Sequence, residues 1–303
     1  MKKIKRRRTV TVGIPAHNEA ANIGNLLKSV RSQTGRNFKL ERIIVICDGC
    51  TDDTANIARS AGAYVIERKK REGKMFVLNQ IYPLNNSDIL ITLDADLVLA
   101  GRSEIREIIG QFENPDVSIS VFHQEPVEPD SFVGKICRAA DRFWIESRIY
   151  VNGGDHIHNL QGSATALRAD VARKVRYPID LNNDAGYLYL QAKKFGAFKY
   201  AYDTKVLYRT PDTLRDFWLI GSRAIFYRYE KLAKYLGRGA IKEYEIPLRF
   251  KIRGLFSALY QNPVYTFLAI LLNVLVRLFP KKGRAVQSRR WQMAQSVRKA
   301  ISI

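Results

Sequence analysis

The sequence predicts an α/β fold in which a mostly parallel β-sheet is flanked by helices and followed by a C-terminal helical region. Three observations lead to this prediction. Short apolar runs rich in β-branched residues alternate with helix-like segments over roughly the first 200 residues, as in strand–helix–strand units. Polar motifs follow several of these runs, where the strands of a parallel sheet would end. Beyond residue 211 the chain changes to aromatic, basic and hydrophobic segments.

Each expected element follows from a local pattern. The apolar, β-branched runs predict strands over residues 9–14, 42–47, 64–67, 89–93, 117–122, 160–166 and 198–208. The helix-like segments between them predict helices over residues 19–31, 52–60, 74–81, 103–112, 132–150, 169–175 and 186–195. We expect three parts: a basic N-terminal tail over 1–8, an α/β domain over 9–211, and a helical, membrane-associating region over 212–303.

Charge is the unusual feature of the composition. The 303 residues carry a formal charge of +21, although their 46% hydrophobic and 26% charged content is that of a globular protein. Residues 205–303 contain 20 Lys and Arg against 5 Asp and Glu. This asymmetry indicates a polyanionic partner, either nucleic acid or an anionic membrane surface.

Cysteine content and the N-terminus bear on the compartment. Three cysteines are too few for a disulfide framework and fit a reducing cytosol. No apolar stretch follows the basic start before Thr9, so we expect no signal peptide.

The C-terminal region contains two notable helical segments. A long helix expected over 214–235 interleaves aromatic and basic residues, and 264–279 is the most hydrophobic stretch. The latter has 16 residues, whereas a membrane-spanning helix needs about 20. A short span, a helix lying in the membrane interface and a buried helix all remain open. Basic residues on both sides favour a helix that lies on the cytoplasmic face of a membrane.

The most informative motif is Asp94-Ala95-Asp96. It comes directly after the apolar run 89–93, so two carboxylates stand where a central strand ends. Two acidic side chains at this spacing can share a hard divalent cation, and a nucleoside diphosphate can complete its oxygen ligands.

Four further motifs place polar groups at the ends of expected strands or the starts of helices. They are Pro15-Ala16-His17-Asn18-Glu19, Asp48-Gly49-Cys50-Thr51-Asp52-Asp53-Thr54, Glu72-Gly73-Lys74 and Asn182-Asn183-Asp184. A parallel sheet would bring such loops together along one edge. Some of these residues have simpler alternatives, since Asp48, Asp52 and Asp184 could each serve only to cap a turn or helix.

In this order the motifs resemble those of the family 2 glycosyltransferases, which have the Rossmann-like GT-A fold. The resemblance covers about residues 10–223. It implies a nucleotide-sugar pocket that includes Pro15, Ala16, Glu19, Asp48, Lys74, Asp94 and Ala95. It also implies that Asp94 and Asp96 bind Mn²⁺ or Mg²⁺, and that Asp184 is the general base of a single displacement with inversion.

On the acceptor side, we expect Gly162, Ser163, Trp144 and Arg223, although Gly162 could serve only backbone geometry and the Phe143-Trp144 pair could be core packing. His156 and His158 are candidates for a third metal ligand or an acceptor contact, or are plain polar surface. The chain departs from the family pattern in having Asn183 before Asp184 where a glutamate is usual, and Asp180 competes for the role of base. Of the Gln-x-x-Arg-Trp motif of processive synthases only Arg223 is present, which weakens any case for polymer synthesis.

We therefore expect a metal-dependent inverting glycosyltransferase that uses a UDP- or GDP-sugar. Its acceptor would be lipid-linked or a saccharide near an anionic membrane, with polyprenyl phosphate as one variant. Two alternatives remain. A nucleic-acid-binding protein would explain the charge but leaves the acidic motifs unexplained, and nucleic acid is not our expected partner. A sugar nucleotidyltransferase would need a Gly-rich, Arg-containing loop after the first strand, where residues 15–19 stand instead.

Overall fold

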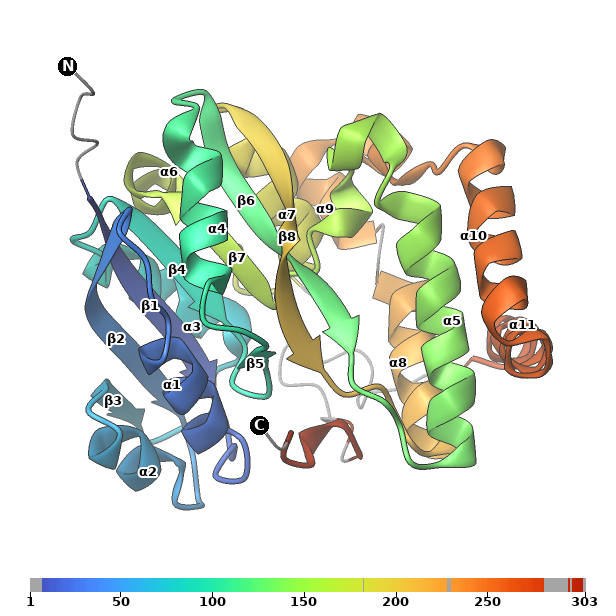
Figure 1. The fold of residues 1–303 in the computed structure, drawn as a ribbon, viewed down its shortest axis with the longest axis horizontal. Helices are drawn as coiled ribbons and strands as arrows, with labels where there is room; N and C mark the ends of the chain where they lie inside the picture. Colours follow the sequence, from blue (N-terminus) through green and yellow to red (C-terminus); the bar gives the residue numbers. More distant parts are fainter. Residues whose placement is uncertain (1–6, 182, 228–229, 281–293, 295, 302–303) are drawn as a thin grey trace.

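A computed structural model describes residues 7–181, 183–227, 230–280, 294 and 296–301. One eight-stranded sheet forms its centre (Figure 1). The strands are β1 (Arg8–Ala16), β2 (Phe38–Asp48), β3 (Tyr64–Arg68), β4 (Ile89–Leu93), β5 (Val98–Leu99), β6 (Val117–Pro126), β7 (Ala164–Arg168) and β8 (Ala197–Tyr208). The α-helices are α1 (Ile23–Arg31), α2 (Thr54–Ser60), α3 (Lys74–Ile81), α4 (Glu104–Gly110), α5 (Phe132–Arg148), α6 (Ala169–Lys174), α7 (Asp184–Ala192), α8 (Leu214–Tyr227), α9 (Glu230–Leu236), α10 (Leu248–Gln261) and α11 (Pro263–Leu278).

The sheet is mixed and mostly parallel, as predicted. Its strand order is β3-β2-β1-β4-β7-β6-β8-β5. Strand β1 pairs in parallel with β2 and β4, β2 with β3, and β6 with β8. Strand β7 runs antiparallel between β4 and β6, and the short β5 runs antiparallel to β8. The carboxyl ends of β1, β2 and β4 therefore meet at one edge.

Alternating side chains divide the interior into two cores, one on each face of the sheet. In β2, Ile43, Val45 and Cys47 pack with α1, α2 and α4, whereas Ile44 and Ile46 pack with α3, α6 and α7. This two-residue period is expected when both faces of a strand are covered. It explains why these strands appear in the sequence as continuous apolar runs rather than as alternating ones.

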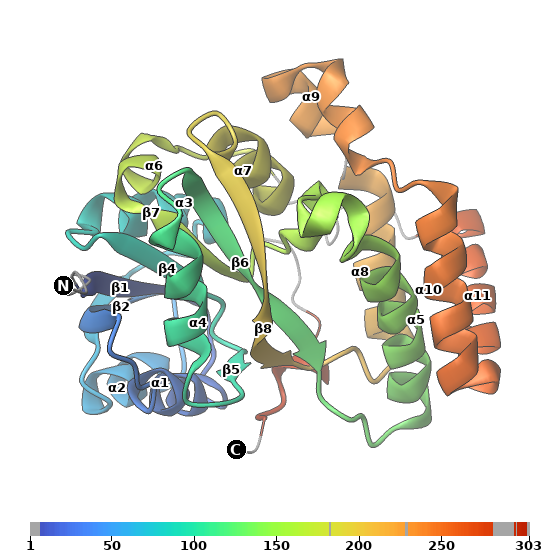
Figure 2. The same cartoon turned by 45° about the horizontal axis from the view of Figure 1, so that its top comes forward.

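The C-terminal helices pack beside α5, on the side of the molecule away from β1–β3 (Figures 1 and 2). Helix α10 approaches α5 closely at Gly254, where a Cβ atom would lie 2.1 Å from the Ser147 Oγ. Helix α11 packs on α8 at Gly221, where a Cβ atom would lie 2.9 Å from a methyl group of Val276. Two glycines thus permit the close packing that places α11 on the outside.

Most predicted elements are present, with shifted boundaries. Helix α1 begins at Ile23 rather than at residue 19, because the backbone from Glu19 to Asn22 forms a turn in which the Glu19 carbonyl accepts from the Asn22 and Ile23 N–H groups. The sequence did not predict β5 or α10. The predicted long helix over 214–235 is described as α8 and α9, with 228–229 outside the described residues.

Several basic residues of the tails, at 1–6 and 281–293, also lie outside the described residues. The predicted division of the chain at 211 stays a prediction. In the described part of the chain, no helix has both the length and the apolar character needed to cross a membrane.

Candidate active site

A cleft of about 500 Å³ opens at the edge where β1, β2 and β4 end. It brings together most of the residues that the sequence singled out. The predicted residues that line it are Pro15, Ala16, Glu19, Asp48, Lys74, Asp94, Ala95, Asp96, Ser163, Asp184 and Arg223. The carboxylates of residues 48, 94 and 96 thus face one cleft, although they come from loops far apart in the sequence.

Lys74 connects the carboxylates of Asp94 and Asp184. It is the first residue of α3, and its Nζ lies 2.7 Å from Asp94 Oδ1 and 3.1 Å from Asp184 Oδ2. The same ammonium group donates to the Gly162 carbonyl at 3.1 Å. Although burial alone would lower it, the pKa of Lys74 is raised, because the charges of Asp184 and Asp94 stabilise the ammonium form. Lys74 is therefore a fixed cation at the centre of the cleft.

Asp94 and Asp96 are held so that both carboxylates are difficult to ionise. The pKa of Asp94 is raised to about 7, mainly by burial. The charge of Lys74 opposes this shift, and the charge of Asp96 contributes to it. Burial raises the pKa of Asp96 to about 6, and the charge of Glu19 adds to this. Crowded carboxylates of this kind favour a bound cation, which would compensate their charge.

Asp184 stands at the start of α7 but does not cap it. The Asn183 side chain takes that role by accepting from the Gly186 N–H at 2.9 Å. The Asp184 carboxylate lies instead against Gly162, whose φ is +78° and where a Cβ atom would lie 2.6 Å from Asp184 Oδ2. Gly162 does not itself line the cleft, but it allows the carboxylate and the ammonium group of Lys74 to meet there.

Asp48 organises the loop that precedes Lys74. Its carboxylate accepts from the Glu72 N–H at 2.8 Å and from the Gly73 N–H at 2.7 Å. Gly49 has φ of +65°, and a Cβ atom there would lie 2.6 Å from the Arg71 backbone nitrogen. The Asp-Gly pair at the end of β2 therefore holds the loop over 69–73 against the cleft. The predicted contact of Asp48 with a nucleobase stays a prediction.

Arginines supply further positive charge. Arg71 and Arg223 both line the cleft, from the loop before α3 and from α8. The pKa of Arg223 is lowered to about 10, mainly by burial. The charge of Asp216 opposes this shift, and the nearby charge of Arg71 contributes to it. A buried guanidinium group beside a second one favours an anionic ligand such as a diphosphate.

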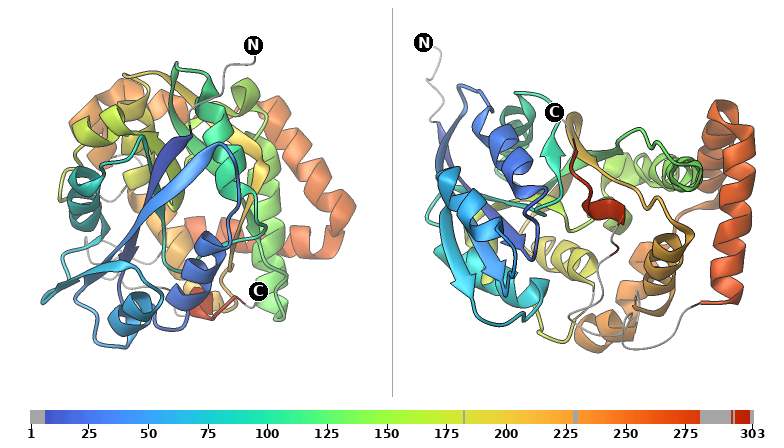
Figure 3. Two further views of the ribbon diagram at one scale, coloured as in Figure 1. Left: turned by 60° about the vertical axis from the view of Figure 1, so that its left-hand side comes forward. Right: turned by 90° about the horizontal axis from the view of Figure 1, so that it is seen from below.

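The C-terminal segment 296–301 packs against the turn that carries Glu19 at the border of the cleft, a contact that sequence reasoning missed. Arg298 donates to the Glu19 carboxylate at 3.1 Å and to the His17 carbonyl at 2.7 Å. The side chains of Asn22 and Asn25 each donate at 2.9 Å to backbone carbonyls of Arg298 and Ile301. Figure 3 shows this segment, in dark red, beside the sheet. Arg298 thus orders the turn that carries Glu19.

Arg71 was also missed as a site residue. The run Lys69-Lys70-Arg71 is visible in the sequence, but nothing in it indicates which of the three cations faces a cleft. No local signal marks Arg298 either.

Four predicted candidates, Trp144, His156, His158 and Asp180, lie elsewhere. Trp144 is on α5, where its ring packs edge-on to Phe143 at 5.0 Å between centroids, and it does not line the cleft. His156 is buried and stacks on His158, and its ring bonds to the Glu245 carbonyl at 3.2 Å.

Asp180 accepts from the Tyr235 hydroxyl and pairs with Lys234, so it does not compete with Asp184. Contacts with later parts of the chain hold His156 and Asp180 in these places, and Trp144 is placed by α5.

The donor set fits a divalent cation held by few protein ligands. Among the residues described, no three His, Cys, Asp or Glu side chains are grouped as a metal site. Asp94 and Asp96 would supply two carboxylate oxygens, and a nucleotide diphosphate and water would supply the rest. The pKa values of both residues are raised, so a bound cation would offset the cost of ionising the two carboxylates.

Comparison with known proteins points in the same direction. The model of the family described as Glycosyl transferase family 2 matches residues 11–176. In sequence, the chain is 32% identical over 111 residues to a 4,4'-diaponeurosporenoate glycosyltransferase of Staphylococcus aureus, covering 35% of this chain and only 28% of that relative.

Two solved structures share the fold. A mannosyltransferase of Pyrobaculum calidifontis, solved with GDP-Man and Mn²⁺, superimposes with a TM-score of 0.61 at 18% identity, covering 91% of this chain and 77% of that one. Glucosyl-3-phosphoglycerate synthase of Mycobacterium tuberculosis, solved with phosphoglyceric acid, gives a TM-score of 0.53 at 18% identity, covering 79% and 81%. The architecture described above is thus that of the GT-A fold.

Proposed function

This chain belongs to glycosyl transferase family 2 and is a glycosyltransferase, and we propose that it transfers a sugar from a nucleoside diphosphate to a membrane-proximal acceptor. The observation that carries the proposal is the position of Lys74, which joins Asp94 on the donor side to Asp184 on the acceptor side of one cleft. The donor would be a UDP- or GDP-sugar. The Pyrobaculum calidifontis mannosyltransferase, which was solved with GDP-Man and Mn²⁺, supports this assignment.

The leaving diphosphate requires compensation of its charge. In our proposal Arg71, Lys74 and Arg223 attract the diphosphate, and Asp94 and Asp96 hold Mn²⁺ or Mg²⁺. The cation would neutralise the negative charge that develops on the diphosphate as it leaves the sugar. Arg298 positions Glu19 at the edge of this pocket. The turn over 15–19 would then form one wall for the nucleotide.

The acceptor side depends on Asp184. An acceptor hydroxyl is a poor nucleophile unless a carboxylate takes its proton as the new bond forms. Asp184 would take that proton while the acceptor oxygen attacks the anomeric carbon from the face opposite the diphosphate. The product would have inverted configuration. Ser163, whose carbonyl accepts from the Asp94 N–H at 2.8 Å, connects this side to the donor loop.

A thermal-shift experiment tests the donor and the metal together. We expect UDP or GDP with Mn²⁺ to raise the melting temperature at pH 7.5, and neither nucleotide nor Mn²⁺ alone to reproduce the increase. The effect should be much smaller at pH 5.5, because Asp94 and Asp96, with pKa values of about 7 and 6, must lose their protons to bind a cation. These values predict an apparent metal affinity that is about 100-fold weaker at pH 5.5.

The stability of the metal-free protein should depend on pH in the opposite direction. Both pKa values lie above the ordinary carboxyl value, so these two groups contribute stability that is present at pH below about 4 and is lost as the pH rises through 6 to 7. A nucleotide-induced shift of equal size with and without Mn²⁺, or one independent of pH, would contradict the assignment of the two aspartates.

We also propose that the protein works on the anionic, cytoplasmic face of a membrane. Large apolar side chains form an exposed stripe along each of the two outer helices. They are Leu248, Ile252, Phe256 and Tyr260 on α10, and Val264, Phe267, Ile270, Leu271, Val274 and Leu278 on α11. Their spacing of three or four residues places each set on one helix face. Exposed Arg249, Lys251 and Arg277 accompany them, which suits an interfacial helix on anionic lipid.

Replacing Phe256 and Phe267 with serine should release the protein from vesicles that contain phosphatidylglycerol. Both side chains are about two-thirds exposed, at 67% and 66%. Each buried aromatic contributes roughly 1.5–3 kcal/mol, so we expect the double variant to bind at least about tenfold more weakly in a sedimentation assay. Tyr64→Ser, which removes an exposed aromatic from β3 at the other end of the molecule, is the matched control (Figure 1). If Tyr64→Ser lowered the affinity for vesicles by the same factor, the α10–α11 surface would not be the membrane contact.

A further inference from the structure

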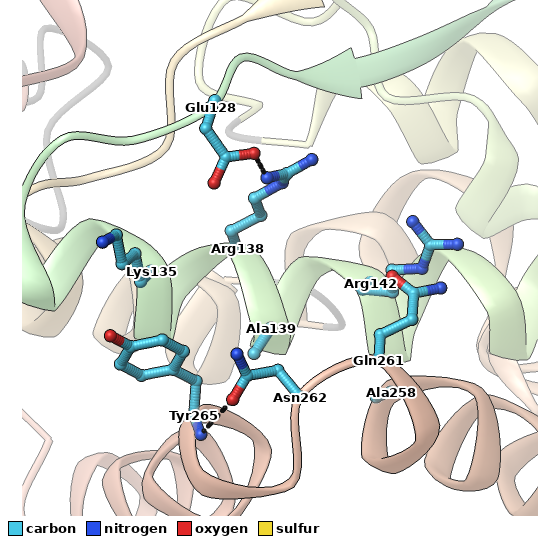
Figure 4. Close-up of a pocket in the computed structure, with 9 residues that line it drawn as sticks. All are labelled: Glu128, Lys135, Arg138, Ala139, Arg142, Ala258, Gln261, Asn262 and Tyr265. Carbon is cyan, nitrogen blue, oxygen red and sulfur yellow. Dashed lines mark hydrogen bonds and ion pairs between the residues drawn. The ribbon is translucent and has the colours of Figure 1, made fainter.

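A second cavity, of about 340 Å³, lies between α5 and the corner where α10 meets α11 (Figure 4). None of its residues lines the catalytic cleft. Its principal polar residues are Lys135, Arg138 and Arg142 on one side, and Gln261, Asn262 and Tyr265 on the other. Neither the family resemblance nor the transfer reaction gives this cavity a role.

Positive charge dominates the α5 side. Lys135, Arg138 and Arg142 are spaced by three and four residues, so they project from one face of the helix. Glu128 is the one carboxylate among the residues lining the cavity, and it pairs with Arg138. Three cations therefore face one anion around the cavity. This leaves an excess of positive charge that an anionic ligand would compensate.

Two of these cations have hydrogen-bonding capacity to spare. The Arg142 Nε is buried and has no hydrogen-bond partner among the described residues. The Nη2 atom of the same guanidinium group lies 3.8 Å from Glu146 Oε1, which is too long for a hydrogen bond. No carboxylate in the described ranges pairs with Lys135. A buried donor without a partner destabilises the fold, and a bound oxyanion would supply the missing acceptor.

The opposite wall adds neutral donors and a helix N-terminus. Asn262 caps α11 by accepting from the Tyr265 N–H at 3.1 Å, so the 16-residue helix starts at the cavity. The positive end of its dipole favours an anion there. The side-chain amide of Gln261 also borders the cavity. Together with the α5 cations, this chemistry suits the several oxygens of a phosphate group.

Exposed apolar residues stand in the chain next to two of the lining residues, Gln261 and Asn262. Tyr260 is 92% exposed and Val264 is 64% exposed, and they flank Gln261 and Asn262 in the chain. They belong to the apolar stripe of α10 and α11 described above. We propose that this cavity binds the phosphate of a membrane lipid headgroup, with the acyl chains lying along the stripe. The phosphate site concerns a ligand separate from the sugar donor, so it does not depend on the transfer reaction.

The test compares two double variants with the same loss of charge. K135Q/R142Q removes two cations from the cavity, and R249Q/K251Q removes two exposed cations from α10 that do not line it. Each basic residue near an anionic surface adds to the general attraction, so both variants should bind phosphatidylglycerol vesicles more weakly. If the cavity binds the headgroup, K135Q/R142Q should lose at least about tenfold more affinity than R249Q/K251Q.

Two outcomes would overturn the lipid assignment. Equal losses in the two variants would reduce the cavity to part of a diffuse positive surface. Calorimetric binding of inorganic phosphate that K135Q/R142Q abolishes, with vesicle binding equal to that of R249Q/K251Q, would assign the cavity to a soluble phosphate compound. Melting temperatures equal to that of the unmodified protein show that both variants fold. None of these measurements uses transferase activity, so they remain informative if the proposed reaction is wrong.

Discussion

Replacing Asp96 with alanine is expected to lower kcat/KM by about three orders of magnitude, or roughly 4 kcal/mol of transition-state stabilisation. Asp96 faces the cleft beside Asp94 and Glu19, and no other side chain of the described residues bonds to its carboxylate. Its loss would remove a carboxylate that compensates a bound cation, and with it the metal-dependent increase in melting temperature produced by the nucleotide. Steady-state kinetics and the thermal shift measure the two effects separately.

Stability should change in the opposite direction to activity. Burial and the charge of Glu19 oppose ionisation of Asp96, so the metal-free variant should melt at or above the temperature of the unmodified protein at neutral pH. Asp170→Ala is the matched control, because its carboxylate lies on α6 and pairs with Arg168 at 2.6 Å, away from the cleft. That variant should lose a little stability and keep its activity. A fully active D96A protein would show that Asp96 has no part in catalysis.

Replacing Asp184 with asparagine is expected to lower kcat by about 10² to 10⁴, the usual contribution of a positioned general base. The substitution keeps the shape of the side chain and its place against Gly162, and Lys74 retains its ion pair with Asp94. Binding of nucleotide with Mn²⁺ should therefore change little. Single-turnover kinetics and nucleotide titration separate the two steps.

Asp180→Asn provides the matched control for this prediction. Asp180 is the nearby competing carboxylate, but the structure places it against Tyr235 and Lys234, so kcat should be unaffected. If D184N kept its full rate, Asp184 would not be the general base. That result would favour an acceptor oxygen that is already ionised, as in a polyprenyl phosphate, and would leave the donor assignment intact.

Local patterns were sufficient for the elements that carry the site. Continuous apolar runs such as 89–93 predicted strands buried on both faces, and the structure has β4 there, between β1 and β7. The motif Asp94-Ala95-Asp96 follows that strand, so its position at the edge of the sheet is a consequence of strand direction. Because the carboxyl ends of parallel strands meet, Asp48 and Glu19 were also expected nearby.

Elements stabilised by distant contacts were harder to predict. Strand β5 has two residues and exists because it pairs with β8, about a hundred positions later in the chain. Helix α10 was not predicted, and close packing of Gly254 on α5 holds it in place. Trp144 was expected on the acceptor side, but it lies on α5 and does not line the cleft.

By itself, then, the sequence determined the alternation of strands and helices and the fold class. It also determined which acidic and basic groups stand at the strand ends, because these features depend on side-chain periodicity and chain direction. The tertiary structure decided which charged groups lie together: it places Lys74 between Asp94 and Asp184, Arg298 on Glu19 from 279 positions away, and three cations of α5 around a separate cavity. Contacts of that kind depend on how helices and loops pack across the sheet. No local pattern encodes that packing, because its free energy comes from residues far apart in the chain.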